Sequence, residues 1–167
     1  IERIEVTPAN DTLVTRRNSV TEPLVNYNVF VLDQQYGNNS SISLTNASTL
    51  RDGSFTDANV TALVIDHNDK ALKNNYSAEL KLSNRFLADD IKSGTAVELD
   101  WRDTSGNWQP RLSYDFVSDD WDPNDLGRNF RTNFHQFYGE IQYEQFVPTG
   151  IFNSYRFELG AGHRRSA

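Results

Sequence analysis

Apolar and polar residues alternate along several stretches of this chain, and this alternation constrains the fold more than any other feature. In residues 76–83, tyrosine, alanine and leucine alternate with serine, glutamate and lysine, and the same period recurs in 97–102, 108–116 and 155–162. A period of two residues places the apolar side chains of a strand on one face of a sheet and the polar ones on the other. The chain is therefore predicted to be all-β, with a sheet that is apolar on one face and charged on the other.

The spacing of these stretches predicts about eight strands that follow one another along the chain. The predicted strands are residues 25–36, 40–48, 58–67, 74–85, 94–102, 108–117, 134–145 and 152–163. Their lengths are near the roughly 9–11 residues that a tilted strand needs to cross a bilayer, whereas strands of soluble domains more often run to about five or six residues. We therefore expect an antiparallel up-and-down transmembrane β-barrel, of which these strands form part.

The predicted connections alternate between short and long. The short ones are residues 37–39, 68–73, 103–107 and 147–151, and the longer ones are 49–57, 86–93 and 118–133. In an up-and-down barrel every second connection lies on the same side, and outer-membrane barrels combine short periplasmic turns with longer outer loops. This alternation favours the barrel.

Aromatic residues flank the short connections, and we predict that they lie at a membrane–water interface. They are Tyr36, Tyr76, Trp101, Trp108, Phe146 and Phe152. Amphipathic rings prefer that interface and form girdles around membrane barrels. The same rings could instead fill the core of a soluble β-sandwich, whose strands also alternate, so this alternative stays open.

Composition narrows the classes of function and the organisation of the chain. The net charge of −7 argues against sequence-independent binding of nucleic acid, which requires a basic surface, and the lack of cysteine removes disulfides and thiolate chemistry. No apolar run is long enough for a transmembrane helix, and the first residues do not resemble a signal peptide. We expect a piece of a longer exported protein, with a connecting segment or partial strand in residues 1–24 and barrel strands in residues 25–167.

Several short motifs resemble a family of outer-membrane proteins of the Bacteroidota. They are Ser43-Leu44-Thr45-Asn46, Leu50-Arg51-Asp52-Gly53-Ser54-Phe55, Asp57-Ala58-Asn59-Val60-Thr61, Asp122-Pro123-Asn124-Asp125-Leu126-Gly127 and Glu144-Gln145-Phe146-Val147-Pro148-Thr149-Gly150-Ile151-Phe152. Members of that family carry a family-9-type carbohydrate-binding β-sandwich followed by a large carboxy-terminal barrel of unassigned function. The resemblance covers about residues 26 to 165, and it implies that this chain is an internal part of the barrel without the sugar-binding domain.

Charged residues occupy the polar positions of the predicted strands, and we expect them to line the lumen of the barrel. They are Glu79, Lys81, Glu98, Asp100, Arg102, Arg111, Asp115, Glu140, Glu144, Arg156 and Glu158. Opposite charges on adjacent strands can pair, and Asp100 and Arg111 are the pair that we predict. Such a face indicates either a selective pore or a lumen sealed by charge networks, and the sealed lumen is favoured because eight strands leave room only for side chains.

The acidic loop after the sixth predicted strand is the one candidate metal site. Its residues are Asp119, Asp120, Asp122, Asn124 and Asp125. Clustered oxygen ligands suit calcium, but the loop departs from the EF-hand pattern, with Asp125 at the glycine position and Arg131 at the glutamate position. An ordinary Asp-Pro-Asn-Asp turn is the favoured interpretation, with a calcium site as the alternative.

These observations together predict a non-enzymatic segment of a bacterial outer-membrane β-barrel. It is expected to act as a membrane anchor or a solute pore for a surface protein linked to carbohydrate binding, with membrane lipid as its main partner. Other outer-membrane or envelope proteins are further candidate partners, and no nucleic acid, cofactor or catalytic residue is expected. The alternative function is a soluble β-sandwich that binds glycans, with or without calcium.

Overall fold

The computed structural model describes residues 2–6, 12–16, 22–37, 39–53, 55–123 and 131–167. Two short strands, β1 (Glu2–Val6) and β2 (Thr12–Arg16), pair into an antiparallel hairpin. They lie in the region that the sequence predicts to be a connecting segment or partial strand. Among the described residues, no helix has the length and apolar character needed to span a membrane.

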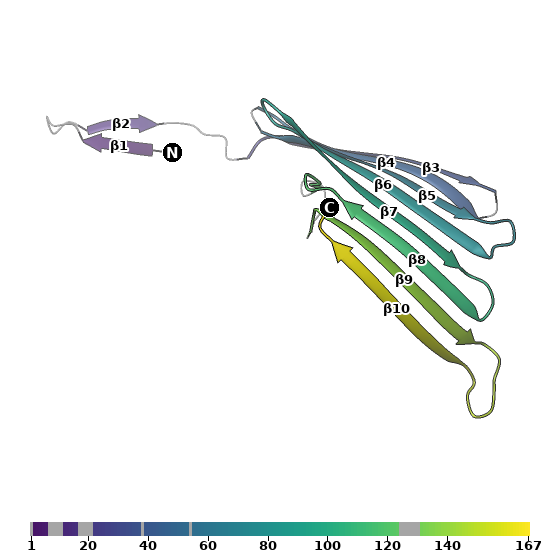
Figure 1. Ribbon diagram of the computed structural model, residues 1–167. Helices are drawn as coiled ribbons and strands as arrows, with labels where there is room; N and C mark the ends of the chain where they lie inside the picture. Colours follow the sequence, from purple (N-terminus) through teal and green to yellow (C-terminus); the bar gives the residue numbers. More distant parts are fainter. Residues whose placement is uncertain (1, 7–11, 17–21, 38, 54, 124–130) are drawn as a thin grey trace.

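The main body of the chain is one eight-stranded antiparallel sheet (Figure 1). Its strands are β3 (Val25–Tyr36), β4 (Ser40–Arg51), β5 (Asp57–Asn68), β6 (Asn74–Phe86), β7 (Ile91–Asp103), β8 (Trp108–Val117), β9 (Phe134–Gln145) and β10 (Tyr155–Arg165). Each strand pairs with the strand that follows it in the chain, so the topology is up-and-down. The predicted all-β class, strand number and topology are therefore confirmed.

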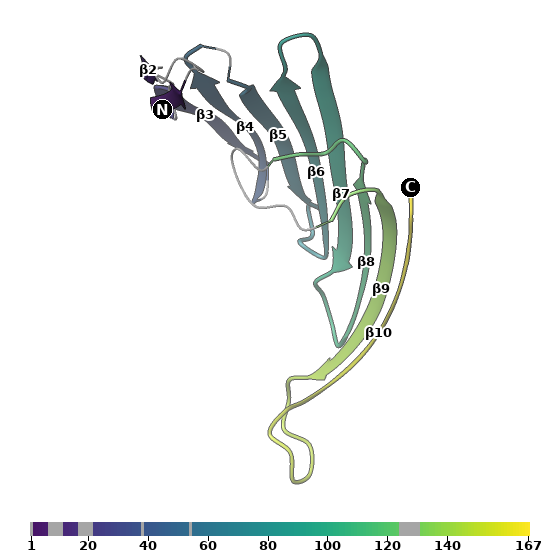
Figure 2. The ribbon, with the colours of Figure 1, turned by 90° about the vertical axis from the view of Figure 1, so that its left-hand side faces the viewer.

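The sheet is open in the described part of the chain. Its edges are β3 and β10, and no pairing joins them. Figure 2 shows that the sheet curves along the strands, with β9 and β10 bending strongly. The strands contain 10 to 13 residues, which is sufficient for a tilted strand to cross a bilayer.

The predicted alternation of short and long connections is wrong. One end of the sheet, which we call the turn end, carries residues 37–39, 69–73, 104–107 and 146–154. The opposite end, which we call the loop end, carries residues 52–56, 87–90 and 118–133, of which only the last is long. The difference arises mainly because β4 continues through Thr49, Leu50 and Arg51, and because β7 begins at Ile91 instead of Gly94. Backbone pairing extends these strands beyond the point where the apolar alternation stops.

Tight turns at the turn end use residues that tolerate a left-handed backbone. Gly37 and Asn39 have φ angles of 54° and 52°, and Gly106 has a φ of 68°. Glycine adopts this region without steric cost, and asparagine visits it more readily than most residues do. These residues let consecutive strands reverse direction over a few residues.

Very few apolar side chains are buried in the described residues. Only Ala58 and Trp121 are buried hydrophobic residues, at 3% and 7% exposure, while many large apolar side chains of the sheet are exposed. In the described part of the chain no second layer of strands covers the main sheet. This distribution is the reverse of that in an ordinary soluble domain, where large aliphatic residues are the most buried.

Candidate functional site

One face of the sheet gathers the charged residues that the sequence predicts to line a lumen. Paired residues in neighbouring strands share a face, and the register places Glu79 opposite Glu98 and Glu98 opposite Asp115. All eleven predicted residues lie on this face, which we call the charged face: Glu79, Lys81, Glu98, Asp100, Arg102, Arg111, Asp115, Glu140, Glu144, Arg156 and Glu158. The structure therefore brings the whole predicted set together across β6–β10.

The opposite face, which we call the apolar face, is the more exposed of the two. It carries Leu80, Leu99 and Leu112, which are 40%, 46% and 57% exposed. By contrast, the Asp100 side chain on the charged face is only 9% exposed. Between β4 and β9, the exposed residues of the charged face are only Lys92, Glu98 and Arg102. The sheet thus shelters its polar side chains and presents its apolar ones.

The predicted pair between Asp100 and Arg111 is confirmed. Arg111 Nε lies 2.6 Å from Asp100 Oδ2, and Arg102 Nη2 lies 3.6 Å from Asp100 Oδ1. The register places Asp100 opposite Ser113 and Arg111 opposite Arg102, so the closer contact is a diagonal one between β7 and β8. The sheltered carboxylate of Asp100 therefore contacts two guanidinium groups that face each other across the strands, and it reduces the repulsion between them.

A row of three carboxylates crosses the centre of the charged face. Glu79, Glu98 and Asp115 are direct neighbours on β6, β7 and β8, an arrangement in which like charges repel. Lys81 Nζ lies 2.6 Å from Glu79 Oε2 and reduces this repulsion at one end. The row makes this part of the face acidic.

On β9 and β10 the charged face is organised around Tyr138. Its hydroxyl donates a hydrogen bond of 2.8 Å to Glu140 Oε2. A Cβ at Gly160 would lie 2.3 Å from the same hydroxyl oxygen, and a Cβ at Gly162 would lie 3.2 Å from the Tyr138 ring. Because the two glycines of β10 have no side chains, the Tyr138 ring extends over them toward the edge of the sheet.

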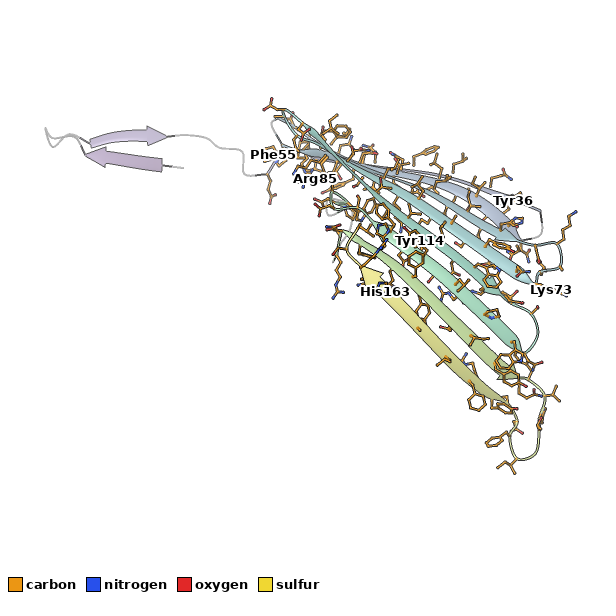
Figure 3. The ribbon with its side chains drawn as sticks, in the orientation of Figure 1. Tyr36, Phe55, Lys73, Arg85, Tyr114 and His163 are labelled. Atoms are coloured by element: carbon orange, nitrogen blue, oxygen red, sulfur yellow. The ribbon has the colours of Figure 1, made fainter. Side chains whose placement is uncertain are left out.

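The predicted interface aromatics lie at the turn end. Tyr36, Tyr76, Trp101 and Trp108 share the apolar face, while Phe146 and Phe152 lie in the connection from β9 to β10. Ring contacts continue the row, from Tyr36 to His67 at 6.1 Å and from Trp108 to Tyr143 at 4.7 Å. Figure 3 shows Tyr36 at this end of the sheet, opposite Arg85 at the loop end. The arrangement is that of an aromatic girdle, although a membrane interface stays a prediction.

The acidic loop is only partly described. Asp122 Oδ2 accepts a hydrogen bond of 2.8 Å from Arg85 Nη1, while Asp119 and Asp120 are exposed. Asn124 and Asp125 lie outside the described residues. Within the described residues, no group of three or more histidine, aspartate or glutamate side chains is placed to hold a metal ion. The calcium site stays a prediction, and the carboxylate of Asp122 contacts an arginine.

The histidines do not contribute to the charged face. His67, His135 and His163 are the three histidines of the chain, and all lie on the apolar face. His135 Nδ1 lies 2.7 Å from the Tyr114 hydroxyl, at the loop end of the sheet. The charged face of β3–β10 consequently has carboxylates and cations but no imidazole for proton transfer at neutral pH.

Sequence reasoning did not find a region where the two faces exchange character. In the loop-end halves of β3–β5, the charged face carries Tyr27, Val29, Ala47, Ala58 and Val60. The apolar face carries Asn26, Asn28, Asn46, Ser48, Asn59 and Thr61 at the same level, with Leu50, opposite Asn26, as an aliphatic exception. We call this region the inverted corner. Its amides satisfy one another, since Asn46 Nδ2 donates to Thr61 Oγ1 at 2.7 Å and Asn59 Nδ2 donates to Asn46 Oδ1 at 3.1 Å.

The fold and its two faces define a class of protein: an up-and-down antiparallel sheet with sheltered charges and exposed aliphatic residues. The family model for Domain of unknown function (DUF5916) matches residues 1–167 of the chain. The chain belongs to this family, whose function is not assigned. No curated protein and no solved structure matches it.

Proposed function

We propose that this chain is part of a transmembrane β-barrel in the bacterial outer membrane. In this proposal the chain serves as a membrane anchor or a solute pore for a surface protein linked to carbohydrate binding, and it is not an enzyme. The apolar face contacts lipid, and the charged face of β6–β10 lines the interior. The resemblance of the sequence motifs to outer-membrane proteins of the Bacteroidota supports the location and the link to carbohydrate.

The observation that carries the proposal is the inverted exposure of the two faces. A soluble β-sandwich buries its apolar face against a second sheet, whereas a membrane barrel exposes that face to lipid. Leu99 and Leu112 are about half exposed, and the neighbouring Asp100 is sheltered. In contact with hydrocarbon, this apolar surface no longer carries the free-energy cost of contact with water. Closure of the barrel by further strand pairing would satisfy the backbone N–H and C=O groups at the sheet edges.

The row of rings at the turn end gives independent support. Tyr76, Trp101 and Trp108 lie at the boundary between the aliphatic part of the apolar face and the turns. Charged side chains of β3–β10 reach the apolar face only at strand ends, at Asp57, Asp103 and Arg165. An aliphatic band bordered by aromatic rings and free of internal charge fits the hydrocarbon core and its interface.

Fractionation of the full-length protein tests the location directly. We expect it to stay in the outer membrane after a high-pH carbonate wash and to dissolve only in detergent. Release into the aqueous fraction would overturn the proposal and favour the soluble glycan-binding sandwich.

Spin labels on β8 test the orientation of the two faces. Residues 1–167 contain no cysteine, so a nitroxide label can be attached at Leu112→Cys or at Ser113→Cys. These neighbouring residues of β8 lie on opposite faces of the sheet. The label at 112 is expected to be relaxed mainly by oxygen, which concentrates in lipid, and the label at 113 less so. A stronger effect of a water-soluble relaxant at 112 than at 113 would contradict a lipid-facing apolar side.

A further inference from the structure

The segment after β8 turns back over the sheet instead of continuing away from it. Ser118 N donates to Thr95 O at 2.9 Å, and Thr95 N donates to Ser118 Oγ at 2.8 Å, so Ser118 is fixed to β7 by its backbone and side chain. Trp121 N then donates to Ser118 O at 3.4 Å in a tight turn. We call residues 118–123 the strap.

The strap is seated on a glycine of the charged face. A Cβ at Gly94 would lie 2.3 Å from both N and Cα of Trp121, so no other residue fits there without moving the strap backbone. Gly94 is buried, and Trp121 is 7% exposed. This close approach fixes the strap on the same face as Asp100.

Two polar contacts hold the strap farther across the sheet, on β6. Asp122 N donates to Ser83 Oγ at 3.1 Å, and the carboxylate of Asp122 lies 2.8 Å from Arg85 Nη1. Ser83 is 2% exposed and lies beside Gly94 in the register. The strap thus runs from the end of β8 over β7 to β6, always on the charged face.

The strap also borders the inverted corner. Its two partners on β6, Ser83 and Arg85, are paired with Val60 and Ala58 of β5, whose side chains share that face. Trp121 and Ala58, the two buried hydrophobic residues among those described, therefore lie on the same face at the loop end. The close approach of Trp121 to Gly94 and the Arg85 contact together fix the strap at this place.

We propose that the strap is a built-in constriction of the barrel interior, which keeps the resting barrel closed to small neutral solutes. The inference rests on the proposed function, because the charged face is an interior only if the strands close in a membrane. An eight-stranded barrel leaves room mainly for side chains, and a strap across three strands narrows even a wider one at the loop end. The barrel then acts as an anchor at rest, and it passes solute only when the strap leaves its seat.

The test compares two glycine variants of the full-length protein in lipid vesicles. Gly94→Ala places a methyl group against the strap backbone, whereas at Gly139 the added Cβ would meet only Leu112 Cδ2 at an ordinary 3.4 Å. We expect Gly94→Ala to increase the rate of vesicle swelling in arabinose several-fold, and Gly139→Ala to leave it at the wild-type level. If the strap has moved in Gly94→Ala and vesicles with the wild type and both variants still swell at equal rates, the proposed constriction is overturned.

Fluorescence of Trp121 shows whether it has moved. Replacing every other tryptophan of the full-length protein by phenylalanine, Trp101 and Trp108 included, leaves Trp121 as the one emitter. Gly94→Ala should make its emission more accessible to acrylamide. More quenching without faster swelling would overturn the constriction, whereas more quenching with faster swelling supports it.

A reversible lock gives a second route, in which one variant is compared with itself in two redox states. Ser83→Cys/Asp122→Cys joins the strap to β6 at the site of an existing contact, in a chain that has no other cysteine. Swelling should be slow when the pair is oxidised and faster after reduction, and the same rate in both states would contradict the proposal. Vesicle flotation distinguishes failure of the proposed function from failure of the constriction. Protein that does not float with lipid overturns the proposed membrane barrel. Protein that floats, and whose strap moves without a change in swelling rate, overturns only the constriction.

Discussion

Strands β6–β10 and the inverted corner use the same two faces of one sheet in opposite ways. In β6–β10 the apolar face carries residues such as Leu80, Leu99 and Leu112, and the charged face carries the ion pairs. In the inverted corner, asparagine, serine and threonine occupy the apolar face, and Tyr27, Val29 and Val60 occupy the other. In the proposed barrel this difference would place lipid against the outer side of β6–β10 and water against the outer side of the loop-end part of β3–β5.

The contrast also separates two uses of the charged face. In β6–β10 this face is held by charge pairs and hydrogen bonds, which need no dry core. In the inverted corner it carries valine, alanine and tyrosine, which gain free energy only if another segment or strand covers them. The strap lies at the border between these regions.

The largest expected effect comes from a charge placed on the apolar face. Leu99→Arg should reduce the free energy of unfolding in lipid vesicles by about 2–4 kcal/mol, because arginine would enter the hydrocarbon core. Asn28→Arg, on the same face in the inverted corner, should change it by less than about 0.5 kcal/mol, since that region faces water. Urea unfolding followed by tryptophan fluorescence measures both, and equal costs would remove the distinction between the regions.

The reverse exchange on the charged face should have a somewhat smaller effect. Val60→Asp in the inverted corner should cost about 1–3 kcal/mol, because its register partners, Ala47 and Ser83, carry no charge to pair with the added carboxylate. Ala96→Asp is the matched control, because Ala96 lies opposite Lys81 within the charged part of the same face. If the control variant loses as much stability as Val60→Asp, the interior of the two regions does not differ.

The ion pair between Asp100 and Arg111 should have a measurable coupling energy. A double-mutant cycle with Asp100→Asn and Arg111→Gln is expected to give about 1–2 kcal/mol, because the Asp100 side chain is sheltered. The pair between Glu79 and Lys81, whose side chains are 25% and 34% exposed, should give about 0.2–1 kcal/mol. A coupling near zero for both pairs would show that the charged face is as fully solvated as an ordinary surface.

The smallest effect is expected at the turn end, away from both regions. Hydrogen bonds from the Asn74 side chain and from Lys73 N lower the pKa of Asp69 below its ordinary value. A lowered pKa in the folded state adds stability above the ordinary aspartate pKa of about 4, and this contribution is lost as the pH falls through the folded value. Asp69→Asn should therefore be less stable than the wild type near neutral pH, and the difference should shrink in acid. A difference that is the same at both pH values would contradict this assignment.

The sequence predicted the charged face well because the alternation in β6–β10 is strong. A period of two determines which residues share a face once strands pair in order, and this was sufficient to group Glu79 with Asp100 and Arg111. The neighbouring pair of Asp100 and Arg111 could be predicted because both belong to one hairpin. The position of the aromatic row follows from the same period.

The inverted corner and the strap were not predicted, for different physical reasons. In residues 25–29 the apolar residues occupy the odd positions, but Phe30, Val31 and Leu32 are apolar at both parities, so the period is interrupted within β3 and does not relate its two halves. The contacts of Trp121 and Asp122 depend on residues of β6 and β7 that are distant in the chain. A signal was present in Gly94, because a single glycine within a strand pattern often marks the close approach of another backbone.

A strap on the inner side of the sheet has a consequence for the order of assembly. It makes hydrogen bonds and an ion pair with β6 and β7, so it can dock as soon as β6–β8 have paired, and Ser118 O also accepts a hydrogen bond of 3.3 Å from Asn133 N just before β9. The hairpin of β9 and β10 follows the strap in the chain, and any closing partner must pair with β10 or β3. Docking before closure needs only local rearrangement, whereas threading the strap into a closed barrel would require strands to separate again. The late strands would then complete a structure whose interior is already filled.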